Sequence, residues 1–215
     1  MTSGSPPSFV QIELLSDTTF SRGEGAAGVV DTEVERDEIG MPFIGGKTVR
    51  GLLRDSWLSM SRHFPSLADA AERVLGRSQA VDESCRLRIG DAVLPAAIRA
   101  AVRGAAERDE QPPEPGVILD GFTSIRYQTA EDRETGAPDV TTLRSSRVVL
   151  RGFILEAGLS WLDGYQPTAS DVRLLALCAL ATRHGGLLRN RGRGHIRMSL
   201  DGDIEATRKY AEATA

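Results

Sequence analysis

The sequence lacks a long apolar run, a surplus of positive charge and more than two cysteines. No stretch approaches the roughly 20 apolar residues of a membrane-spanning helix, and a formal net charge of −4 gives no bulk attraction to nucleic acid. The first residues, MTSGSPPSF, lack a basic region followed by an apolar one, which argues against secretion. Cys85 and Cys178 suit a reducing compartment. We therefore expect a cytoplasmic protein, in which Cys178, within the apolar run LLALCALA, is a buried structural thiol.

Two kinds of site are also missing from the sequence. No group of cysteine and histidine has the spacing of zinc ligands. The residues GGKT at 45–48 resemble the end of a P-loop, but that motif needs its first glycine at position 41, where the chain has Met, and Gly40 comes one residue too early. The preceding residues, DTEVERDEI, are acidic and do not form the pattern of a buried parallel strand. The sequence therefore does not indicate nucleotide hydrolysis by a P-loop.

The residues that are present predict a globular α+β protein, because 215 residues with 40% hydrophobic side chains can form a core. Alternation of apolar residues predicts strands or extended segments at 8–15, 118–129, 147–162 and 194–200. Helical spacing of apolar residues predicts helices at 49–64, 66–76, 95–108 and 168–184. The last of these helices begins with the capping pattern Thr168-x-x-Asp171.

The order of these elements fits an antiparallel sheet with helices on one face, in the ferredoxin-like (RRM-like) arrangement. We expect residues 1–215 to form a single domain. An irregular, acidic loop at about 16–47 is longer than ordinary connections and is expected to be functional. A polar stretch between two extended segments predicts an inserted long hairpin within about 116–160. The residues QPPEPG at 111–116 predict a linker or the entrance to that insertion.

Charge is segregated along the chain. Glu13–Glu38 holds eight acidic residues and two arginines, whereas Arg183–Arg197 holds five arginines and no acid. The basic segment, RHGGLLRNRGRGHIR, interleaves arginine with glycine, so its backbone can approach a polyanion while guanidinium groups bind phosphates. Lys47 and Thr48 fall at a predicted helix N-terminus, where Thr48 is a candidate N-cap and backbone N–H groups can bind an anion. Both segments are candidate phosphate-binding sites.

Three stretches carry a family resemblance: VVDTEVERDEIGMPFIGGKTVRGLLR, TSIRYQTAEDRETGAPDVTTLRSSRVVLRGFILEA and GGLLRNRGRGHIRM. Together, and in this order, they resemble the RAMP superfamily of CRISPR systems, and in particular the backbone subunit of type III effector complexes. The first is similar to the family's loop with two aspartates that precedes a glycine-rich turn and a helix. The positions that match are Asp31 (cleavage aspartate), Asp37 (second acid), Gly46, Arg50, Gly51 and Arg54. The chain departs from the pattern at Gly45, where the family has Pro, and at Lys47-Thr48, where it has Ser-Ser.

The second stretch is similar to the thumb hairpin of the family, which has a polar Asp-Arg-x-Thr-Gly tip. In this chain the tip residues are Asp132, Arg133, Thr135 and Gly136. The third stretch is similar to the glycine-rich loop that precedes the last strand in the superfamily. The resemblance thus implies that the GGKT corner and the arginine–glycine segment contact RNA phosphates.

The resemblance also implies a function. Such a subunit self-associates into a filament-like backbone along a guide RNA (crRNA), beside other effector subunits, and its thumb wedges between guide and target RNA. As an endoribonuclease it cleaves complementary target RNA with Mg²⁺ or Mn²⁺, because a bound 2′-OH can attack the neighbouring phosphorus. Asp31 would be the catalytic residue and a metal ligand, and Asp37 a supporting acid that could instead only order its loop. The RNA-binding residues would be Lys47, Thr48, Arg50, Arg54, Arg189, Arg191 and Arg193.

Two other functions stay open on the sequence alone. One is a non-cleaving structural subunit of the same complex, which binds RNA in the same way but in which Asp31 is not catalytic. The other is a metal-independent endonuclease that processes guide RNA, in which His63, His184 or His195 would be indispensable. We favour structural positions for these histidines, with His184 capping a helix end and His195 in a strand, because a lone histidine without a paired base is not a mechanism.

Overall fold

The computed structural model describes residues 5–21, 23, 25, 30–77, 85–131, 134–162 and 164–213. Its strands are β1 (Phe9–Leu14), β2 (Leu87–Val93), β3 (Thr123–Glu131), β4 (Pro138–Val149), β5 (Ile154–Trp161) and β6 (Ile196–Leu200). Its helices are α1 (Gly46–Met60), α2 (Ala68–Leu75), α3 (Ala96–Arg108), α4 (Pro115–Asp120), α5 (Ala169–Ala181) and α6 (Ile204–Glu212), with short 3-10 segments η1 (Ser61–His63) and η2 (Pro65–Leu67).

Four of the strands form one antiparallel sheet in the order β2-β5-β1-β6. In β1 the alternate residues Val10, Ile12 and Leu14 are buried, whereas Gln11 and Glu13 are only partly covered. This period of two is what a strand with one face in the core produces. The predicted strands at 8–15 and 194–200 are therefore confirmed, as β1 and β6.

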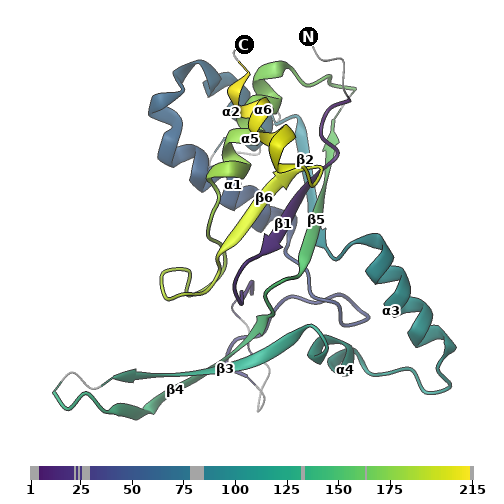
Figure 1. The fold of residues 1–215 in the computed structure, drawn as a ribbon, viewed down its shortest axis with the longest axis vertical. Helices are drawn as coiled ribbons and strands as arrows, with labels where there is room; N and C mark the ends of the chain where they lie inside the picture. Colours follow the sequence, from purple (N-terminus) through teal and green to yellow (C-terminus); the bar gives the residue numbers. More distant parts are fainter. Residues whose placement is uncertain are drawn as a thin grey trace.

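Helices cover the buried face of this sheet (Figure 1). The stripe predicted for the first helix is buried in α1, with Val49 and Leu53 fully inaccessible. In α5, Thr168 and Asp171 form the predicted capping box, in which the Thr168 N–H donates to the Asp171 carboxylate at 2.8 Å. Burial raises the pKa of the Cys178 thiol to about 12, so this cysteine is an inert part of the core. The chain is thus an α+β protein with an antiparallel sheet, as expected.

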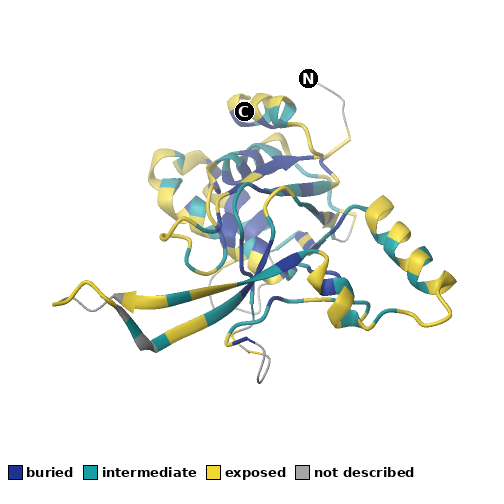
Figure 2. Cartoon of the chain, turned by 60° about the horizontal axis from the view of Figure 1, so that its bottom comes forward, coloured by how far each residue is buried: buried dark blue, intermediate teal, exposed yellow. Residues whose placement is uncertain are grey.

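The strands β3 and β4 form a separate two-stranded antiparallel hairpin. It projects from the sheet and its helices, while α3 lies on the other side of the chain (Figure 1). Much of the hairpin is exposed along its length, and its buried residues lie at the end nearest the main sheet (Figure 2). Among the described helices, none combines the length and the apolar character that crossing a membrane requires.

The boundaries of the hairpin correct two predictions. The polar stretch at 130–146 is mostly strand, since β4 begins at Pro138, and only a short tip separates it from β3. The segment at 147–162 is not one extended element, because the chain turns at Arg151-Gly152, where Gly152 adopts a φ of 91°. A left-handed backbone of this kind favours glycine and ends a strand. β4 and β5 consequently belong to different sheets.

Helix boundaries also differ from the prediction. The helix α1 starts at Gly46 with Gly45 as its N-cap, so Thr48 lies inside the first turn and the N-cap assignment to Thr48 is wrong. The helix α5 ends at Ala181, three residues before His184. The proposed linker at 111–116 already contains the start of α4, because a proline is well suited to a first helical turn.

Candidate nucleic-acid interface

The acidic loop between β1 and α1 passes the foot of the hairpin twice, the foot being residues 145–149 of β4. Thr18 pairs with Val149 through reciprocal backbone hydrogen bonds of 3.0 and 2.8 Å. Further along the loop, Thr32 pairs in parallel with Ser146. The foot therefore receives a backbone partner from each pass of the loop. This arrangement places Asp31, the residue before Thr32, against β4.

Asp31 and Ser145 each donate hydrogen bonds to the other. The Ser145 backbone N–H and hydroxyl donate to Asp31 Oδ2 at 2.6 and 3.0 Å, and the Asp31 N–H donates to the Ser145 hydroxyl at 3.0 Å. The backbone N–H of Ser145 and then its hydroxyl hold the pKa of Asp31 below its usual 3.8; burial acts in the opposite direction, and the charge of Arg144 adds to the lowering. Asp31 is therefore an exposed, ionised carboxylate at neutral pH.

A low pKa makes Asp31 a weak proton acceptor, since general bases work best with a pKa near the operating pH. The same ionised, oriented carboxylate is well suited to orient a hydroxyl group or to bind a cation. Sequence analysis located Asp31 but missed Ser145, because it assigned this part of β4 to a polar tip.

The arginine–glycine loop comprises residues 185–194 between α5 and β6. Its two ends are joined by a hydrogen bond of 2.9 Å from the Gly185 N–H to the Gly194 carbonyl. Just outside them, His184 and His195 pair as an isolated bridge and their rings stack with centroids 5.2 Å apart. The loop is thus closed at a narrow neck, and His184 lies at this neck rather than at a helix cap.

Backbone hydrogen bonds hold this loop on the start of the acidic loop. The Leu187 N–H donates to the Thr19 carbonyl at 2.9 Å, and the Gly194 N–H donates to the Asp17 carbonyl at 3.1 Å. A Cβ at Gly194 would lie 2.1 Å from the Gly185 carbonyl oxygen, and Gly194 has a φ of 70°. Glycine is therefore required at this position for both space and conformation.

One arginine of the loop reaches the foot of the hairpin. Arg193 Nη1 donates to the Ser146 hydroxyl at 2.8 Å, and its side chain is half-buried. Burial, followed by the positive charge of Arg126, lowers the pKa of Arg193, while Asp17 acts in the opposite direction. Arg126 is itself paired with Asp17, whose Oδ2 accepts from its Nε and Nη2 at 3.0 and 2.7 Å, so a carboxylate of the chain already lies beside these two guanidinium groups.

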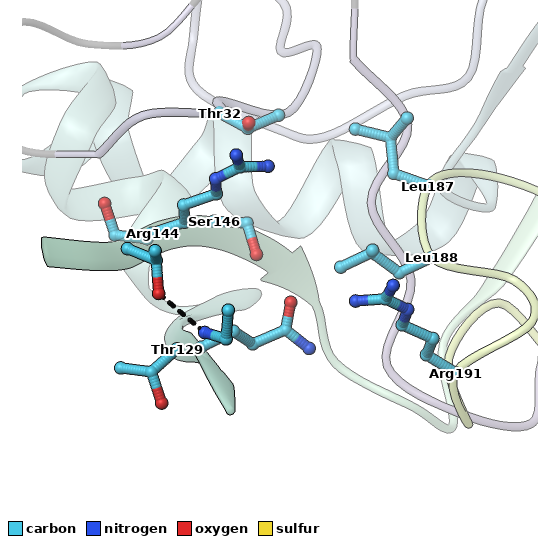
Figure 3. A pocket seen from close by; sticks show the side chains of 11 residues that line it. Thr32, Thr129, Arg144, Ser146, Leu187, Leu188 and Arg191 are labelled. Carbon is cyan, nitrogen blue, oxygen red and sulfur yellow. Dashed lines mark hydrogen bonds between the residues drawn. The ribbon is translucent and has the colours of Figure 1, made fainter. Parts of the chain in front are cut away.

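The other two arginines differ in their surroundings. Arg191 is exposed and lines a pocket of about 420 Å³ between the loop and the hairpin (Figure 3). Arg189 lies 3.8 Å from Asp55 of α1, and both side chains are exposed. The described residues that line the pocket are Thr32, Gln128, Thr129, Ala130, Thr142, Arg144, Ser145, Ser146, Leu187, Leu188 and Arg191. Among the described residues that line this pocket are two arginines and no acid, and Ser145 belongs both to the pocket and to the Asp31 contact.

Two backbone donors at the N-terminus of α1 are bound within the chain. The Gly46 N–H donates to Asp91 Oδ1 at 2.7 Å, and the Gly45 N–H donates to Glu35 Oε2 at 3.2 Å. These two donors already bind carboxylates of the chain itself. Lys47 and Thr48 are exposed beside them, and their contact with RNA stays a prediction.

Arg50 has a packing contact that the sequence did not reveal. Its guanidinium donates to the carbonyls of Val74 and Leu87 at 3.1 and 2.5 Å and to Cys85 Sγ at 2.9 Å. It thereby ties α1 to the end of α2 and to β2. Arg54 lines a separate groove between α1 and α2. Neither arginine belongs to the lining of the pocket at the hairpin.

Asp37 organises a turn of the acidic loop. Its Oδ1 accepts hydrogen bonds from the N–H groups of Ile39, Gly40 and Met41 at 3.1, 3.0 and 2.9 Å. A carboxylate that caps successive N–H groups stabilises a tight turn. This geometry supports the alternative in which Asp37 orders the loop.

The tip of the hairpin is described only in part. Thr135 and Gly136 are exposed, with Gly136 at a φ of 66° and the Thr135 hydroxyl accepting from the Ala137 N–H at 3.3 Å. The predicted tip residues Asp132 and Arg133 lie outside the described residues.

A buried arginine fixes the acidic loop to the hairpin, and sequence analysis missed it as well. Arg147 is only 8% exposed and pairs with Glu33 at 2.9 Å and with Asp120 at 2.5 Å. It also donates to the Thr123 hydroxyl at 3.1 Å. Since Glu33 is two residues from Asp31, this network holds the segment that carries Asp31 against β4.

The described residues offer few metal ligands. Within them, no group of three or more His, Cys, Asp or Glu side chains could hold an ion. Asp31 is one exposed carboxylate, and Mg²⁺ in proteins is commonly held by one or two carboxylates together with substrate phosphates and water. The donor set therefore fits a divalent ion only if RNA supplies further oxygen ligands.

Comparison with known proteins gives a family match. The family model of the RAMP superfamily matches residues 11–197. No curated protein matches the chain by sequence. Three similar structures are chains of CRISPR complexes. Two of them belong to the type III-B Cmr-beta complex, one in the apo state and one bound to cognate target RNA, and each has a TM-score of 0.64 and 13% identity to this chain. The matched region covers 92% of this chain for the apo structure and 93% for the RNA-bound one, and 98% of the other chain in both cases. A chain of a type IV-B CRISPR complex has a TM-score of 0.58 and 12% identity, with 90% of each chain covered.

Proposed function

Because the chain belongs to the RAMP superfamily, we propose that it is a backbone subunit of a CRISPR effector complex. In this role it binds the phosphates of a guide RNA and cleaves complementary target RNA, with Asp31 as the catalytic residue. The observation that carries this proposal is the position of Asp31, bound by Ser145 beside a pocket whose described lining includes two arginines and no acid. The similar folds found in type III-B and type IV-B CRISPR complexes support it.

Two finer features of the fold belong to this proposal. The main sheet has the strand order β2-β5-β1-β6, with α1 between its first two strands in sequence and α5 before its last. This order supports a ferredoxin-like domain. The β3–β4 hairpin, which projects beside the arginine–glycine loop (Figure 1), is the thumb in this proposal.

In this proposal, arginines around the hairpin foot bind the RNA phosphates. Arg191 and Arg144 face the pocket, Arg193 lies at Ser146, and Arg189 is exposed further along the loop. Guanidinium groups bind phosphates in a fixed, forked geometry and do not read the base sequence. Such a grip suits a subunit that must accept any guide, and a chain with net charge −4 can provide it because the positive charges are gathered here.

In the cleavage step, the target RNA supplies its own nucleophile. The 2′-oxygen forms a bond to the adjacent phosphorus, the bond to the 5′-oxygen breaks, the 2′ proton leaves to solvent, and the 5′-oxygen takes a proton from solvent. Asp31 orients the reacting ribose, and Ser145 fixes the direction of the Asp31 carboxylate. Arg144 and Arg191 bind the flanking phosphates. Asp31 would be the protein ligand of a Mg²⁺ or Mn²⁺ ion, which would supply stabilisation of the charge that develops on the phosphoryl group.

The second candidate is the metal-independent endonuclease, and the stacked pair of His184 and His195 favours it. Two imidazoles at the neck of a basic loop could serve as acid and base. A chelator distinguishes the candidates, because cleavage through Asp31 and a divalent ion stops on its addition whereas histidine chemistry continues.

The proposal predicts partners that can be recovered with the protein. Purified from cells with an active CRISPR locus, the chain should carry short RNA of uniform 5′ sequence and other effector subunits, and copies of the chain should associate along that RNA. Sequencing of the bound nucleic acid tests this directly. Recovery of DNA, or of no nucleic acid at all, would contradict the proposal.

A further inference from the structure

The two edges of the β3–β4 hairpin differ in what covers them. We propose that the outer edge of β3, the side that faces away from β4, pairs with the same edge of a second copy of the chain. The two strands run antiparallel about a two-fold axis, and the two hairpins join into one continuous sheet. This inference concerns the chain without RNA and goes beyond the proposed function, on which it does not rest.

The acidic loop covers the edge of β4. The Arg147 N–H donates to the Thr32 carbonyl at 2.9 Å, and the Thr32 N–H donates to the Ser145 carbonyl at 3.2 Å. Nearer the main sheet, Val149 exchanges two backbone hydrogen bonds with Thr18. The backbone groups of these three β4 residues therefore point away from β3 and are bound, so β4 is not an open edge at the foot of the hairpin.

The edge of β3 has no such cover. Ile125 and Tyr127 stand opposite Arg147 and Ser145 in the hairpin. Where one residue of an antiparallel pair directs its backbone groups outward, the residue opposite it does so as well. The backbone N–H and C=O groups of Ile125 and Tyr127 consequently point to the outer edge of β3. Within the part of the chain that the structure describes, no other segment bonds to these two N–H groups.

The residues along this edge favour pairing with another strand. Natural edge strands are commonly protected by lysine or proline, and the stretch IRYQT at 125–129 contains neither. It is rich instead in β-branched and aromatic residues. Its one charged side chain, Arg126, is paired with Asp17 at 2.7 Å. The large side chain of Tyr127 is 63% exposed and lies on the hairpin itself.

The irregularity of the hairpin lies in the other strand. Gln128 pairs with Arg144, and Ala130, two residues further along β3, pairs with Asp139, five residues back along β4. The extra residues therefore belong to β4. A bulge in an edge strand would hinder the addition of a partner strand, and this one does not lie in β3.

The outer edge of β3 is complementary to itself. If Tyr127 lies opposite Tyr127 of the other copy, the antiparallel register places Ile125 opposite Thr129 and Arg126 opposite Gln128 of that copy. Paired aromatic and β-branched side chains stabilise neighbouring strands, and no like charges face each other in this register. The two-fold axis repeats each contact. A second copy thus supplies everything that the edge needs, which is why we choose it over an unrelated protein.

A two-fold contact of this kind closes at two copies. Association of many copies along an RNA needs a contact between two different surfaces, so the β3 dimer is a separate form of the free chain. A single pair of strands buries little surface, and contacts below about 1,200 Å² of total area are typical of weak, transient complexes. We therefore expect a dimer that forms at high concentration and dissociates on dilution.

Sedimentation velocity of the full chain, freed of nucleic acid, tests the pairing. The wild type should pass from monomer to dimer as its concentration rises. Tyr127→Lys replaces two facing rings by two facing charges, and should weaken the dimer at least about tenfold. Tyr127→Phe keeps the ring and should dimerise like the wild type. Leu58→Lys places the same charge at another exposed apolar residue, on α1, and is the control that should also dimerise like the wild type.

Disulfide formation tests the register. In the proposed pairing the Cα atoms at position 127 of the two copies are about 5.5 Å apart, a distance that a disulfide bridges. The Cα atoms at position 128 are offset along the strands and lie about 8 Å apart, which is too far. Oxidised glutathione, which accepts the two electrons of the two thiols, should therefore link Tyr127→Cys into a dimer and leave Gln128→Cys unlinked. Cys85 and Cys178 are present in both variants and do not affect the comparison.

Each possible result decides for or against the pairing. A wild type that stays monomeric at every concentration would overturn the proposal, and so would a Tyr127→Lys variant that dimerises as the wild type does. Species larger than a dimer would show an open contact rather than a two-fold one. Equal linking of Gln128→Cys and Tyr127→Cys would contradict the register. Circular dichroism verifies the fold of every variant, and none of these results bears on whether the chain binds RNA.

Discussion

The Ser145 backbone N–H and hydroxyl both donate to Asp31 Oδ2, at 2.6 and 3.0 Å, and the Asp31 N–H donates back to that hydroxyl at 3.0 Å. A strand of the hairpin therefore fixes a carboxylate of the acidic loop from which it is 114 residues distant in sequence. In the proposed function, the element that separates guide from target also directs the residue that cuts.

Substitution of Ser145 should lower cleavage without weakening the grip on RNA. Ser145→Ala removes the hydroxyl bond to an ionised acceptor but keeps the backbone bond, so we expect a loss of about tenfold or more in the cleavage rate. Ser145→Thr retains the hydroxyl and suits a strand, and it should restore most of the rate. Single-turnover cleavage and RNA affinity, measured on the same preparations, check this. Equal rates in the wild type and Ser145→Ala would show that the contact does not position Asp31.

The neck of the arginine–glycine loop should be intolerant of a side chain. In Gly194→Ala the new Cβ meets the Gly185 carbonyl oxygen, which must move, so the loop opens and RNA affinity falls. Gly192→Ala is the matched control, because Gly192 also has a positive φ, 76°, but a Cβ there meets no atom within 4 Å. We expect it to cost about 1–2 kcal/mol of local strain and little affinity. Fluorescence anisotropy with labelled single-stranded RNA would measure both. Similar affinities for the two variants would contradict the role of the neck.

Arg147 should matter for stability more than any exposed arginine of the hairpin. Arg147→Met leaves Glu33 without its partner in a partly buried position, and should lower the free energy of unfolding by about 3 kcal/mol. Arg144→Met, which replaces an exposed arginine on the same strand, is the control and should change the free energy of unfolding by less than about 0.5 kcal/mol. Urea unfolding, followed by circular dichroism, decides between them. Equal stability of the two variants would refute the structural role of Arg147.

The arginines of the loop should govern the salt dependence of RNA binding. Arg191→Ala removes an exposed phosphate contact, so the slope of log affinity against log salt should fall by about 0.7 for single-stranded RNA. Arg208→Ala, which removes an exposed charge paired with Glu205 on α6, is the control. Titrations at several salt concentrations measure the slopes. An unchanged slope in Arg191→Ala would remove this residue from the interface.

The sequence was sufficient for elements that depend on local pattern. β1, the buried stripe of α1 and the capping box at Thr168 follow from residues close in sequence, and each was predicted. β2, α4 and α6 were not predicted. They are short or weakly apolar, and β2 is stabilised chiefly by its pairing with β5, a partner distant in sequence.

The site was predictable only in part, for the same reason. A motif match located Asp31, and arginine content located the basic loop. The contact with Ser145 could not be predicted, because TTLRSSRVV contains too many polar residues to indicate a strand until its pairing with β3 is known. Arg50 likewise lies in a stretch that resembles the family. Its side chain, however, donates hydrogen bonds to carbonyl groups that are distant in sequence, and these contacts could not be predicted.

Cleavage of guide-complementary RNA by the assembled complex tests the central claim most directly. The assay compares Asp31→Ala with Glu38→Ala, which removes an exposed acid of the same loop, and verifies RNA binding and assembly for both. With Mg²⁺ or Mn²⁺ present, Glu38→Ala should cut like the wild type. Asp31→Ala should lose about 10²–10⁴-fold in rate with its RNA affinity intact. Cleavage by Asp31→Ala at the wild-type rate would contradict the account, and leave a subunit that grips RNA without cutting it at this residue.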